Sequence, residues 1–474
     1  MCLLQGVSYN NTYYYPHHPH SQFKANNLPL RTRVRRCIKD VIATHCSETE
    51  KEWGIVSESI FLELNSVHFP RSFPIDLMHC ILQNITPMLY SLWNGSKLSI
   101  DRSSTYEDQN AGDWPPYNIG KPASILETLG NALESSRNTI PSSLGHAPRR
   151  IDRHHAGFKA SEWAAWLTMY GNPLITNLLD DIYVDNFRIL SQLYILATQT
   201  MLDETDIAQV GHLAIAFVES YERIYYRGQH ERLPTLTVNL HYLLHLEQHL
   251  RDCGPGWAFW QFPMERFAGV VKPLAKSKSQ LSYSLSNSLM MIEHLNHYHF
   301  VRGRSGKENP QYPQLLTPCT GRLYQTAWDL INTHFQTLSN AIQQVIHHGM
   351  ISSYLRCQLR SDLVIGSEIQ LRTELNRVNY VICYTEGDHY GATVRFANVK
   401  LFIEVEGIGK WALVSGSRDV PTIDPVVRLA YYDRRNSREE KWIQVSDIKS
   451  VVGELKGLRS DNIVYCVTDY GLYD

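Results

Sequence analysis

The pattern of apolar residues changes near residue 360, and this change limits the possible folds more than any other feature of the chain. Between residues 160 and 250 apolar side chains recur at helical spacing, as in Ile207, Val210, Leu213, Phe217, Tyr221 and Ile224. Later apolar residues form short β-branched or aromatic runs, most of them separated by turn residues: Thr393–Phe396, Lys400–Glu406, Lys410–Ser415, Val427–Asp433, Lys441–Val445 and Ile463–Val467. The sequence therefore predicts a mainly α fold, a helical body with a small C-terminal β-barrel-like domain.

Three regions follow from this pattern in a chain of 474 residues, a length typical of roughly two to four domains. We expect residues 1–60 to be an irregular N-terminal segment that contains one helix, at 28–52. Residues 61–355 form the helical domain, and residues 360–474 form the small β domain. Within the helical domain, the apolar run from Leu77 to Trp93 indicates a buried helix, and Asp203 is expected to cap a helix that begins after it.

The near-neutral net charge means that any surface that binds nucleic acid must be a local basic patch. The formal net charge is −2, with 45 Lys and Arg residues against 47 Asp and Glu residues, whereas DNA-binding domains are usually basic. Two basic runs stand out, Arg31 to Arg36 and Lys272 to Lys278, although each is more often a solvated face than a phosphate contact. The nine cysteines are scattered singly, which indicates a reducing intracellular compartment. No run approaches the ~20 apolar residues of a membrane helix, so no membrane partner is expected.

Three histidines, His241, His245 and His249, recur at i, i+4 and i+8 on one predicted helix, with leucines on the opposite face. The zinc-protease motif requires glutamate directly after the first histidine, but Tyr242 occupies that position. Three histidines along two turns also span about 12 Å, too far for one ion. The pattern favours a packing or solvated role, and a metallohydrolase built here would need carboxylates on the same face.

Two short motifs carry candidate chemistry. Asp76 and His79 form an Asp-x-x-His pair at the edge of the apolar helix, where a carboxylate is commonly a cap or dipole partner. Glu265 and Arg266 lie between an aromatic, proline-containing stretch and Phe267, so the pair is expected to be half-buried and to need partners. Each motif alone has an ordinary structural explanation.

Taken together, these segments resemble the CACTA (En/Spm-like) DNA transposases, in the form found in fungal genomes. The resemblance covers roughly residues 60–300. Its segments are Phe73 to His79, Asn84 to Leu89, Leu92 to Gly95, Gly157 to Trp163, Phe217 to Tyr226, the His241/His245 helix, Gly254 to Trp257 and Phe262 to Gly269. The β region after residue 360 is also similar to the tail that such proteins often carry.

The resemblance implies a ribonuclease H-like catalytic domain interrupted by a helical insertion, in which two aspartates and a glutamate hold two Mg²⁺ ions that cut and join DNA at element ends. Asp76 and His79 match the family's Asp-x-x-His element. Glu265 matches the third acid, a catalytic residue and metal ligand. The residues expected to contact DNA are Arg266, Lys272, Lys276 and Lys278.

One departure from the family changes the expected activity. Both catalytic aspartates of the family lie upstream of the segment that resembles residues 1–26, and Cys2 matches the end of a family Cys-x-x-Cys stretch. We therefore expect a truncated, catalytically incomplete transposase, in which Mg²⁺ belongs only to an intact relative. DNA is the expected partner, the nucleus the expected location, and self-association is expected from uncovered apolar surface. The alternative is a domesticated module that binds nucleic acid or a protein partner without catalysis.

Overall fold

The computed structural model divides the chain into two compact units. Unit 1 comprises Met1–Pro122, Phe158–Thr168 and Leu178–Asn287, and unit 2 comprises Ala123–Gly157, Met169–Asn177 and Ser288–Asp474. The structure describes residues 7–9, 12–14, 16, 31–44, 59–68, 71–94, 122–176, 178–275, 280–303, 312–347, 351–360, 363–371, 380–387, 393–424, 429–436, 438–456 and 463–467.

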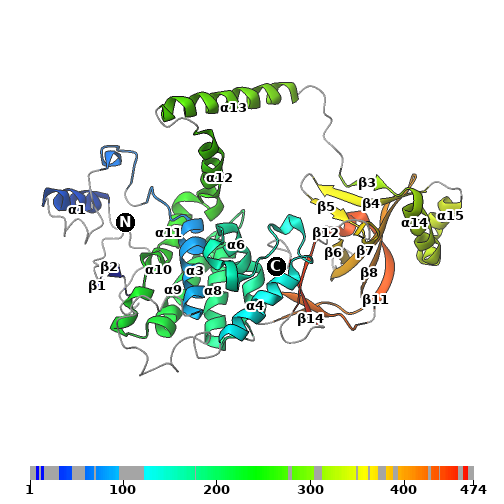
Figure 1. Ribbon diagram of the computed structural model, residues 1–474, viewed down its shortest axis with the longest axis horizontal. Coiled ribbons are helices and arrows are strands. Elements are labelled where there is room, and N and C mark those ends of the chain that lie inside the picture. Colours follow the sequence, from blue (N-terminus) through cyan, green and yellow to red (C-terminus); the bar gives the residue numbers. More distant parts are fainter. Residues whose placement is uncertain are drawn as a thin grey trace. The chain divides into compact units, whose positions relative to one another are not determined.

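Unit 1 is helical apart from one small hairpin (Figure 1). The hairpin is β1 (Val7–Tyr9) and β2 (Thr12–Tyr14). The helices are α1 (Arg31–Ala43), η2 (Ile60–Leu62), η3 (Met78–Ile85), α3 (Thr86–Trp93), α6 (Ala160–Ala165), α8 (Asp181–Ala197), α9 (Glu204–Tyr221), η8 (Glu222–Tyr226), η9 (His230–Thr235), α10 (Val238–Leu243), α11 (Leu246–Cys253), η10 (Gly256–Ala258), α12 (Phe262–Val271) and η11 (Lys272–Leu274). The predicted helix at 28–52 corresponds to α1, and the rest of that range lies outside the described residues.

The start of α9 follows from capping chemistry. The Asp203 carboxylate accepts hydrogen bonds from the N–H groups of Thr205 (2.7 Å) and Asp206 (2.8 Å), and Asp206 in turn accepts from the Asp203 N–H (3.0 Å). This reciprocal pair satisfies N–H groups that have no partner within α9. The predicted cap at Asp203 is therefore confirmed.

The core of unit 1 surrounds the continuous helix made by η3 and α3. Leu77 and Trp93, at its two ends, are fully buried, which confirms the predicted buried helix. The Trp93 indole N–H donates to the Tyr225 hydroxyl (2.9 Å), and its ring lies 5.4 Å from that of Phe187 on α8. The aromatic groups therefore contribute both apolar area and a satisfied buried polar contact.

Unit 2 contains an eight-stranded antiparallel sheet and a four-stranded one. The larger sheet runs β11-β8-β7-β4-β3, with β6 and β12 joined at β7 and β5 joined at β4. Its strands are β3 (Gln314–Pro318), β4 (Ile351–Arg360), β5 (Leu363–Gly366), β6 (Val381–Glu386), β7 (Thr393–Val405), β8 (Gly409–Ser417), β11 (Arg438–Gln444) and β12 (Ile448–Val451). The smaller sheet runs β13-β14-β10-β9, with strands β9 (Thr422–Ile423), β10 (Ala430–Asp433), β13 (Gly453–Lys456) and β14 (Ile463–Val467).

Unit 2 also contains several helices among its described residues. They are α4 (Pro122–Ser136), which begins at the edge of unit 1, η5 (Ser142–Leu144), α5 (Ile151–His154), η6 (His155–Gly157), α7 (Gly171–Ile175), α14 (Gly321–Thr333), η12 (Phe335–Thr337), α15 (Asn340–His347), α16 (Glu368–Leu371) and η13 (Val445–Asp447). Ile331 of α14 and Ile342 of α15 pack against Leu401 and Ile403 of β7, beside the sheet in Figure 1. Two elements cross the boundary between the units, η7 (Trp166–Tyr170) and α13 (Leu281–Gly303).

The predicted fold class, a mainly α chain with a small β-barrel-like domain, is wrong. The strands of unit 2 build a large curled eight-stranded antiparallel sheet and a separate four-stranded one rather than a small barrel. β3 and β4 precede residue 360, yet Gln314 pairs with Gln358, and Tyr354 pairs with Phe402. Strand pairing joins segments that are distant in the sequence, so local runs could not give the size of the sheet. In the described part of unit 1 the strands are those of the β1–β2 hairpin, so the expected ribonuclease H-like remnant is not seen there.

None of the described helices combines the length and apolar content needed to cross a membrane.

Candidate functional site

Asp76 lies where the starts of two helices meet. Its Oδ1 accepts hydrogen bonds from the backbone N–H groups of Met78 (3.1 Å) and Gln261 (3.0 Å), and its Oδ2 accepts from the N–H of His79 (3.3 Å). Met78 begins η3, and Gln261 immediately precedes α12. Because N–H groups at helix starts lack partners within the helix and carry partial positive charge, a carboxylate there is stabilising. One largely buried carboxylate therefore joins η3 to α12 across 185 residues of sequence.

His79 and Glu265 extend this contact toward solvent. His79 Nδ1 bonds Asp76 Oδ2, and His79 Nε2 lies 3.8 Å from Glu265 Oε1. The side chains of His79 and Glu265 are 44% and 57% exposed, against 16% for Asp76. The structure thus brings together the three residues predicted to be catalytic. Asp76 orients the imidazole, the imidazole faces Glu265, and Glu265 is the carboxylate open to a ligand.

The Gly254 to Trp257 turn explains how α12 reaches Asp76. Gly254 ends α11 with a φ of 87°, a left-handed conformation that favours glycine. A Cβ on Gly256 would lie 2.3 Å from Leu77 Cδ1 and 2.8 Å from the carbonyl oxygen of Ala197. The chain therefore passes directly over Leu77, the neighbour of Asp76, before α12 begins.

Two further contacts fix the segment that leads to Asp76. The Arg71 guanidinium bonds both carboxylate oxygens of Asp252 on α11, at 2.7 and 2.6 Å. The Ile75 N–H donates to Nδ1 of the buried His249 (3.3 Å). Burial lowers the pKa of His249 to about 4, with a further lowering by His245. His249 is therefore neutral at pH 7 and acts as an acceptor that holds the chain beside Asp76.

Two of the four residues predicted to contact DNA lie next to this network. Arg266 and Lys272 are exposed, and neither side chain pairs with another residue in the described ranges. Lys272 follows Glu265 by seven residues, about two helical turns, which places it near the same face. Lys276 and Lys278 lie outside the described residues. Arg266 on α12 and Lys272 on η11 are thus two exposed cations close to Glu265 in the sequence.

The three histidines do not occupy one continuous helix, because α10 ends at Leu243 and α11 begins at Leu246. Nε2 of His241 and Nε2 of His245 lie 3.1 Å apart, and both rings are buried together with the neighbouring leucines. One ring therefore donates to the other. Within the part of the chain that the structure describes, no third histidine, cysteine or carboxylate joins them in a metal-binding group.

Cys80 also lies next to Asp76 but cannot serve as a nucleophile. Burial raises the pKa of its thiol far above the usual range, and the negative charge of Asp76 raises it further. The thiol donates to the carbonyl oxygen of Asn239 (3.4 Å). Because the thiolate is the reactive form, Cys80 is a packing residue.

The side chains at Asp76 do not fit a pair of magnesium ions. Mg²⁺ prefers oxygen ligands in octahedral geometry, and two-metal sites share several carboxylates. Both oxygens of Asp76 already accept hydrogen bonds, and the neighbour of Glu265 is an imidazole rather than a second open carboxylate. Glu265 alone can supply one carboxylate ligand. No catalytic step through Mg²⁺ follows from these residues.

Sequence reasoning missed the groups that hold the network together. In the Gln261–Asp76 and Ile75–His249 hydrogen bonds the donor is a backbone N–H, which side-chain motifs do not reveal. The sequence did carry one signal, the glycine pair at 254 and 256 directly before the aromatic stretch.

Comparison of the chain with protein-family models, with curated proteins and with solved structures gives no match.

Proposed function

We propose that this chain derives from a CACTA-type DNA transposase, binds duplex DNA in the nucleus through the exposed edge of α12 and η11, and does not cleave DNA by itself. The observation that carries the proposal is the meeting of Asp76, His79 and Glu265, three residues that the sequence resemblance selects from distant segments. The two exposed cations beside Glu265, Arg266 and Lys272, supply the phosphate contacts.

The absence of cleavage follows from the state of the carboxylates. Asp76 is committed to helix starts and to the imidazole, so its role is to position His79 and α12. Glu265 is then the single carboxylate of the network that can take part in chemistry. Two-metal phosphodiester cleavage requires more oxygen ligands than these residues offer.

Binding is tested by fluorescence anisotropy of a labelled 30-base-pair duplex with the full chain, over a range of salt concentrations. The variant Arg266→Gln/Lys272→Gln removes two expected phosphate contacts, and each lost contact is expected to lower the slope of log K against log salt by about 0.9. Arg223→Gln is the matched control, because Arg223 is an exposed cation of unit 1 on η8. Equal slopes for the double variant and the unmodified chain would rule out this surface.

Cleavage is tested with supercoiled plasmid in the presence of Mg²⁺ or Mn²⁺. We expect no nicking by the full chain. Metal-dependent nicking that disappears in Glu265→Gln but persists in Glu63→Gln, an exposed control carboxylate, would show that the site is complete and would contradict the proposal.

A second candidate function, self-association, is favoured by an apolar stripe on α12. Met264, Phe267 and Val270 recur at every third position and are 59%, 50% and 50% exposed. Exposed apolar stripes of this kind are typical of interaction surfaces, and a second copy of the chain offers the same stripe for a symmetric contact. Light scattering after gel filtration should show a dimer that dissociates in Phe267→Ser but not in Ile182→Ser, since Ile182 is an equally exposed residue on α8. A monomer at all concentrations would exclude this function.

A further inference from the structure

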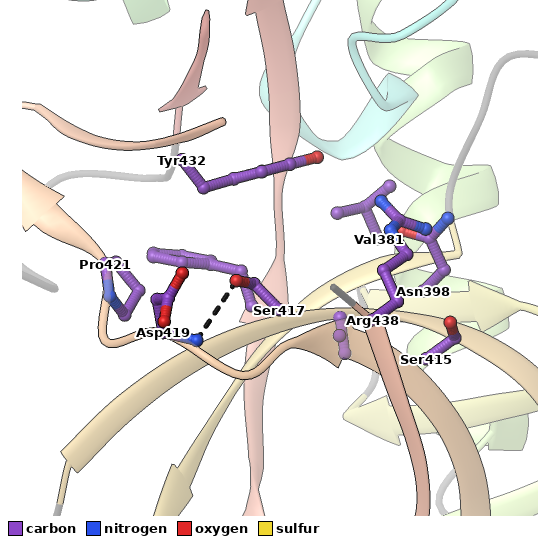
Figure 2. Close-up of a pocket in the computed structure, with 11 residues that line it drawn as sticks. Val381, Asn398, Ser415, Ser417, Asp419, Pro421, Tyr432 and Arg438 are labelled. Carbon is purple, nitrogen blue, oxygen red and sulfur yellow. Dashed lines mark hydrogen bonds between the residues drawn. The ribbon is translucent and has the colours of Figure 1, made fainter. Parts of the chain in front are cut away.

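The small pocket in unit 2 does not have the size of a ligand site. Figure 2 shows it between Tyr432 and Ser417. Once open solvent is left out, it has room for about one water molecule. The exposed apolar surface of the chain is therefore a larger candidate for recognition than this pocket.

Helix α13, one continuous helix in Figure 1, carries more large exposed apolar side chains than any other described helix or strand. No described helix or strand packs extensively against it. The large apolar side chains of α13 that are at least 47% exposed are Leu281, Tyr283, Met290, Met291, Leu295 and Tyr298. Apolar surface of this extent is typical of a site of interaction with another protein.

One face of α13 is a continuous stripe without charge. Residues three, four and seven positions apart lie on the same face of a helix, and a repeat of this spacing is what a second helix packs against. The one Asp, Glu, Lys or Arg residue between positions 281 and 298 is Glu293, which follows Ser288 by five positions and so lies on the other side of the helix. The residues of this α13 stripe are Leu281, Ser284, Leu285, Ser288, Met291, Ile292 and Leu295.

The absence of charge in the α13 stripe decides which partner fits it. Contact with nucleic acid requires Lys or Arg side chains for the phosphates, and a helix that lies on an anionic membrane surface is usually rich in the same residues. A charged protein surface would lose its hydration against the stripe without gaining a partner. The complementary surface is an uncharged apolar helix face, and a second copy of α13 supplies one.

The α13 stripe is symmetric about Ser288, and this symmetry gives the orientation of the pair. Leu281 and Leu295 lie seven residues on either side of Ser288. In an antiparallel pair centred on Ser288, each Leu281 faces Leu295 of the second copy, as a two-fold axis requires. Ile292 faces Ser284, so a large side chain meets a small one. The antiparallel arrangement also brings the opposite partial charges of the two helix ends together.

We propose that two copies of this chain associate through an antiparallel pair of α13 helices that cross at Ser288. The stripe is about 21 Å long from Leu281 to Leu295, from the rise per residue of an α-helix. A contact of this length is at the small end of the range for specific complexes, so the dimer is reversible, with a Kd on the order of micromolar. The α13 stripe is separate from the apolar stripe of α12, and the inference does not rest on DNA binding.

Sedimentation equilibrium of the full chain, from about 1 to 100 µM, tests the association. We expect the average mass to rise with concentration from that of a monomer toward that of a dimer. Leu295→Glu should raise the Kd by about tenfold or more, because it places a carboxylate in each half of an apolar contact. Met290→Glu is the matched control, since Met290 is exposed on the opposite face of α13 and gains the same charge.

A second substitution tests the antiparallel orientation. When Leu281→Lys is added to Leu295→Glu, each new ammonium group faces a new carboxylate of the other copy. The double variant should therefore have a lower Kd than Leu295→Glu alone, most clearly at low salt. In a parallel pair the same substitutions would bring like charges together and would weaken the dimer further.

Four results would overturn the proposal. A monomer at every concentration, from a chain whose circular dichroism shows it to be folded, would exclude the contact. Equal weakening by Met290→Glu and Leu295→Glu would show a general effect of charge. Loss of the dimer in Phe267→Ser but not in Leu295→Glu would assign self-association to α12. A double variant no tighter than Leu295→Glu would rule out the antiparallel pair. Duplex binding is measured separately, so the failure of one proposal is distinguishable from the failure of the other.

Discussion

Acidification should destabilise unit 1 through His249, and the size of the effect can be worked out from the structure. The pKa of His249 is about 4 in the folded chain, mainly because the ring is buried, against about 6.5 in an unfolded chain. Between these values the unfolded state binds one more proton than the folded state, so stability falls as the pH is lowered. The stability is fully present above pH 6.5 and is lost progressively down to about pH 4.

The expected loss is about 3 kcal/mol, because a difference of about 2.5 pKa units corresponds to 1.36 kcal/mol per unit. The pKa of about 4 already includes the effects of the charged groups near His249. His245 and Arg71 lower the pKa of His249 further, and Asp252 raises it. The net result remains a neutral ring that must be protonated before or during unfolding.

The assay is urea unfolding at pH 7.0, 5.5 and 4.5, followed by tryptophan fluorescence, since Trp93 and Trp166 are buried in unit 1. His249→Asn keeps an acceptor near the position of Nδ1 for the Ile75 N–H and removes the titrating group. Compared with the unmodified chain, this variant should lose about 1.4 kcal/mol less stability per pH unit between pH 6.5 and 4. His212→Asn, on the exposed side of α9, is the control. The reasoning is refuted if His249→Asn retains the same pH dependence as the unmodified chain.

Three predictions concern the packing of unit 1 and are tested by thermal unfolding. Gly256→Ala should cost about 1–3 kcal/mol because the added Cβ would overlap Leu77 and the Ala197 carbonyl. Gly269→Ala is the control: it lies on α12 with open space around it and should be neutral or stabilise by up to ~1 kcal/mol. Equal effects of the two substitutions would contradict the close approach at Gly256. Asp76→Ala should cost about 2–3 kcal/mol by leaving N–H groups at two helix starts without their acceptor, and Asp76→Asn should cost less. Tyr225→Phe should cost about 1–3 kcal/mol because it removes the hydroxyl that accepts from the buried Trp93 N–H, and an unchanged melting temperature would refute this.

The sequence predicted local features of the helices better than the tertiary arrangement. The cap at Asp203 and the buried Leu77 to Trp93 helix depend on nearby residues, and both are confirmed. The break in the histidine helix at Leu244 was not predicted, because no glycine or proline marks it in the sequence.

The β region shows where such reasoning stops. The short runs after residue 360 indicated strands, but the sheet also includes β3, which pairs with β4 across the intervening helices α14 and α15. The packing of the two sheets of unit 2, as at Phe396 and Cys466, is likewise not encoded in any local pattern. The meeting of Asp76 with Glu265 was expected only from the family resemblance, since the backbone contact at Gln261 has no sequence signature.

Glu265→Gln distinguishes a DNA-binding edge from a metal-dependent site in a single titration. In the proposed function Glu265 is an exposed negative charge that repels a phosphate bound at Arg266. At a separation of about 7 Å in water this repulsion is about 0.6 kcal/mol, so removing the charge should tighten duplex binding roughly threefold at low salt. The change should be the same with Mg²⁺ or with EDTA, because no metal enters the contact.

A site in which Glu265 holds a metal gives the opposite sign. Mg²⁺ would then link the carboxylate to the phosphate, and Glu265→Gln would weaken binding in Mg²⁺ while leaving binding in EDTA almost unchanged. Anisotropy titrations of both chains under both conditions therefore decide the question without any need for cleavage. Weaker binding of Glu265→Gln only in Mg²⁺ would show that the open carboxylate recruits a metal despite its imidazole neighbour, and the proposed metal-independent edge would have to be abandoned.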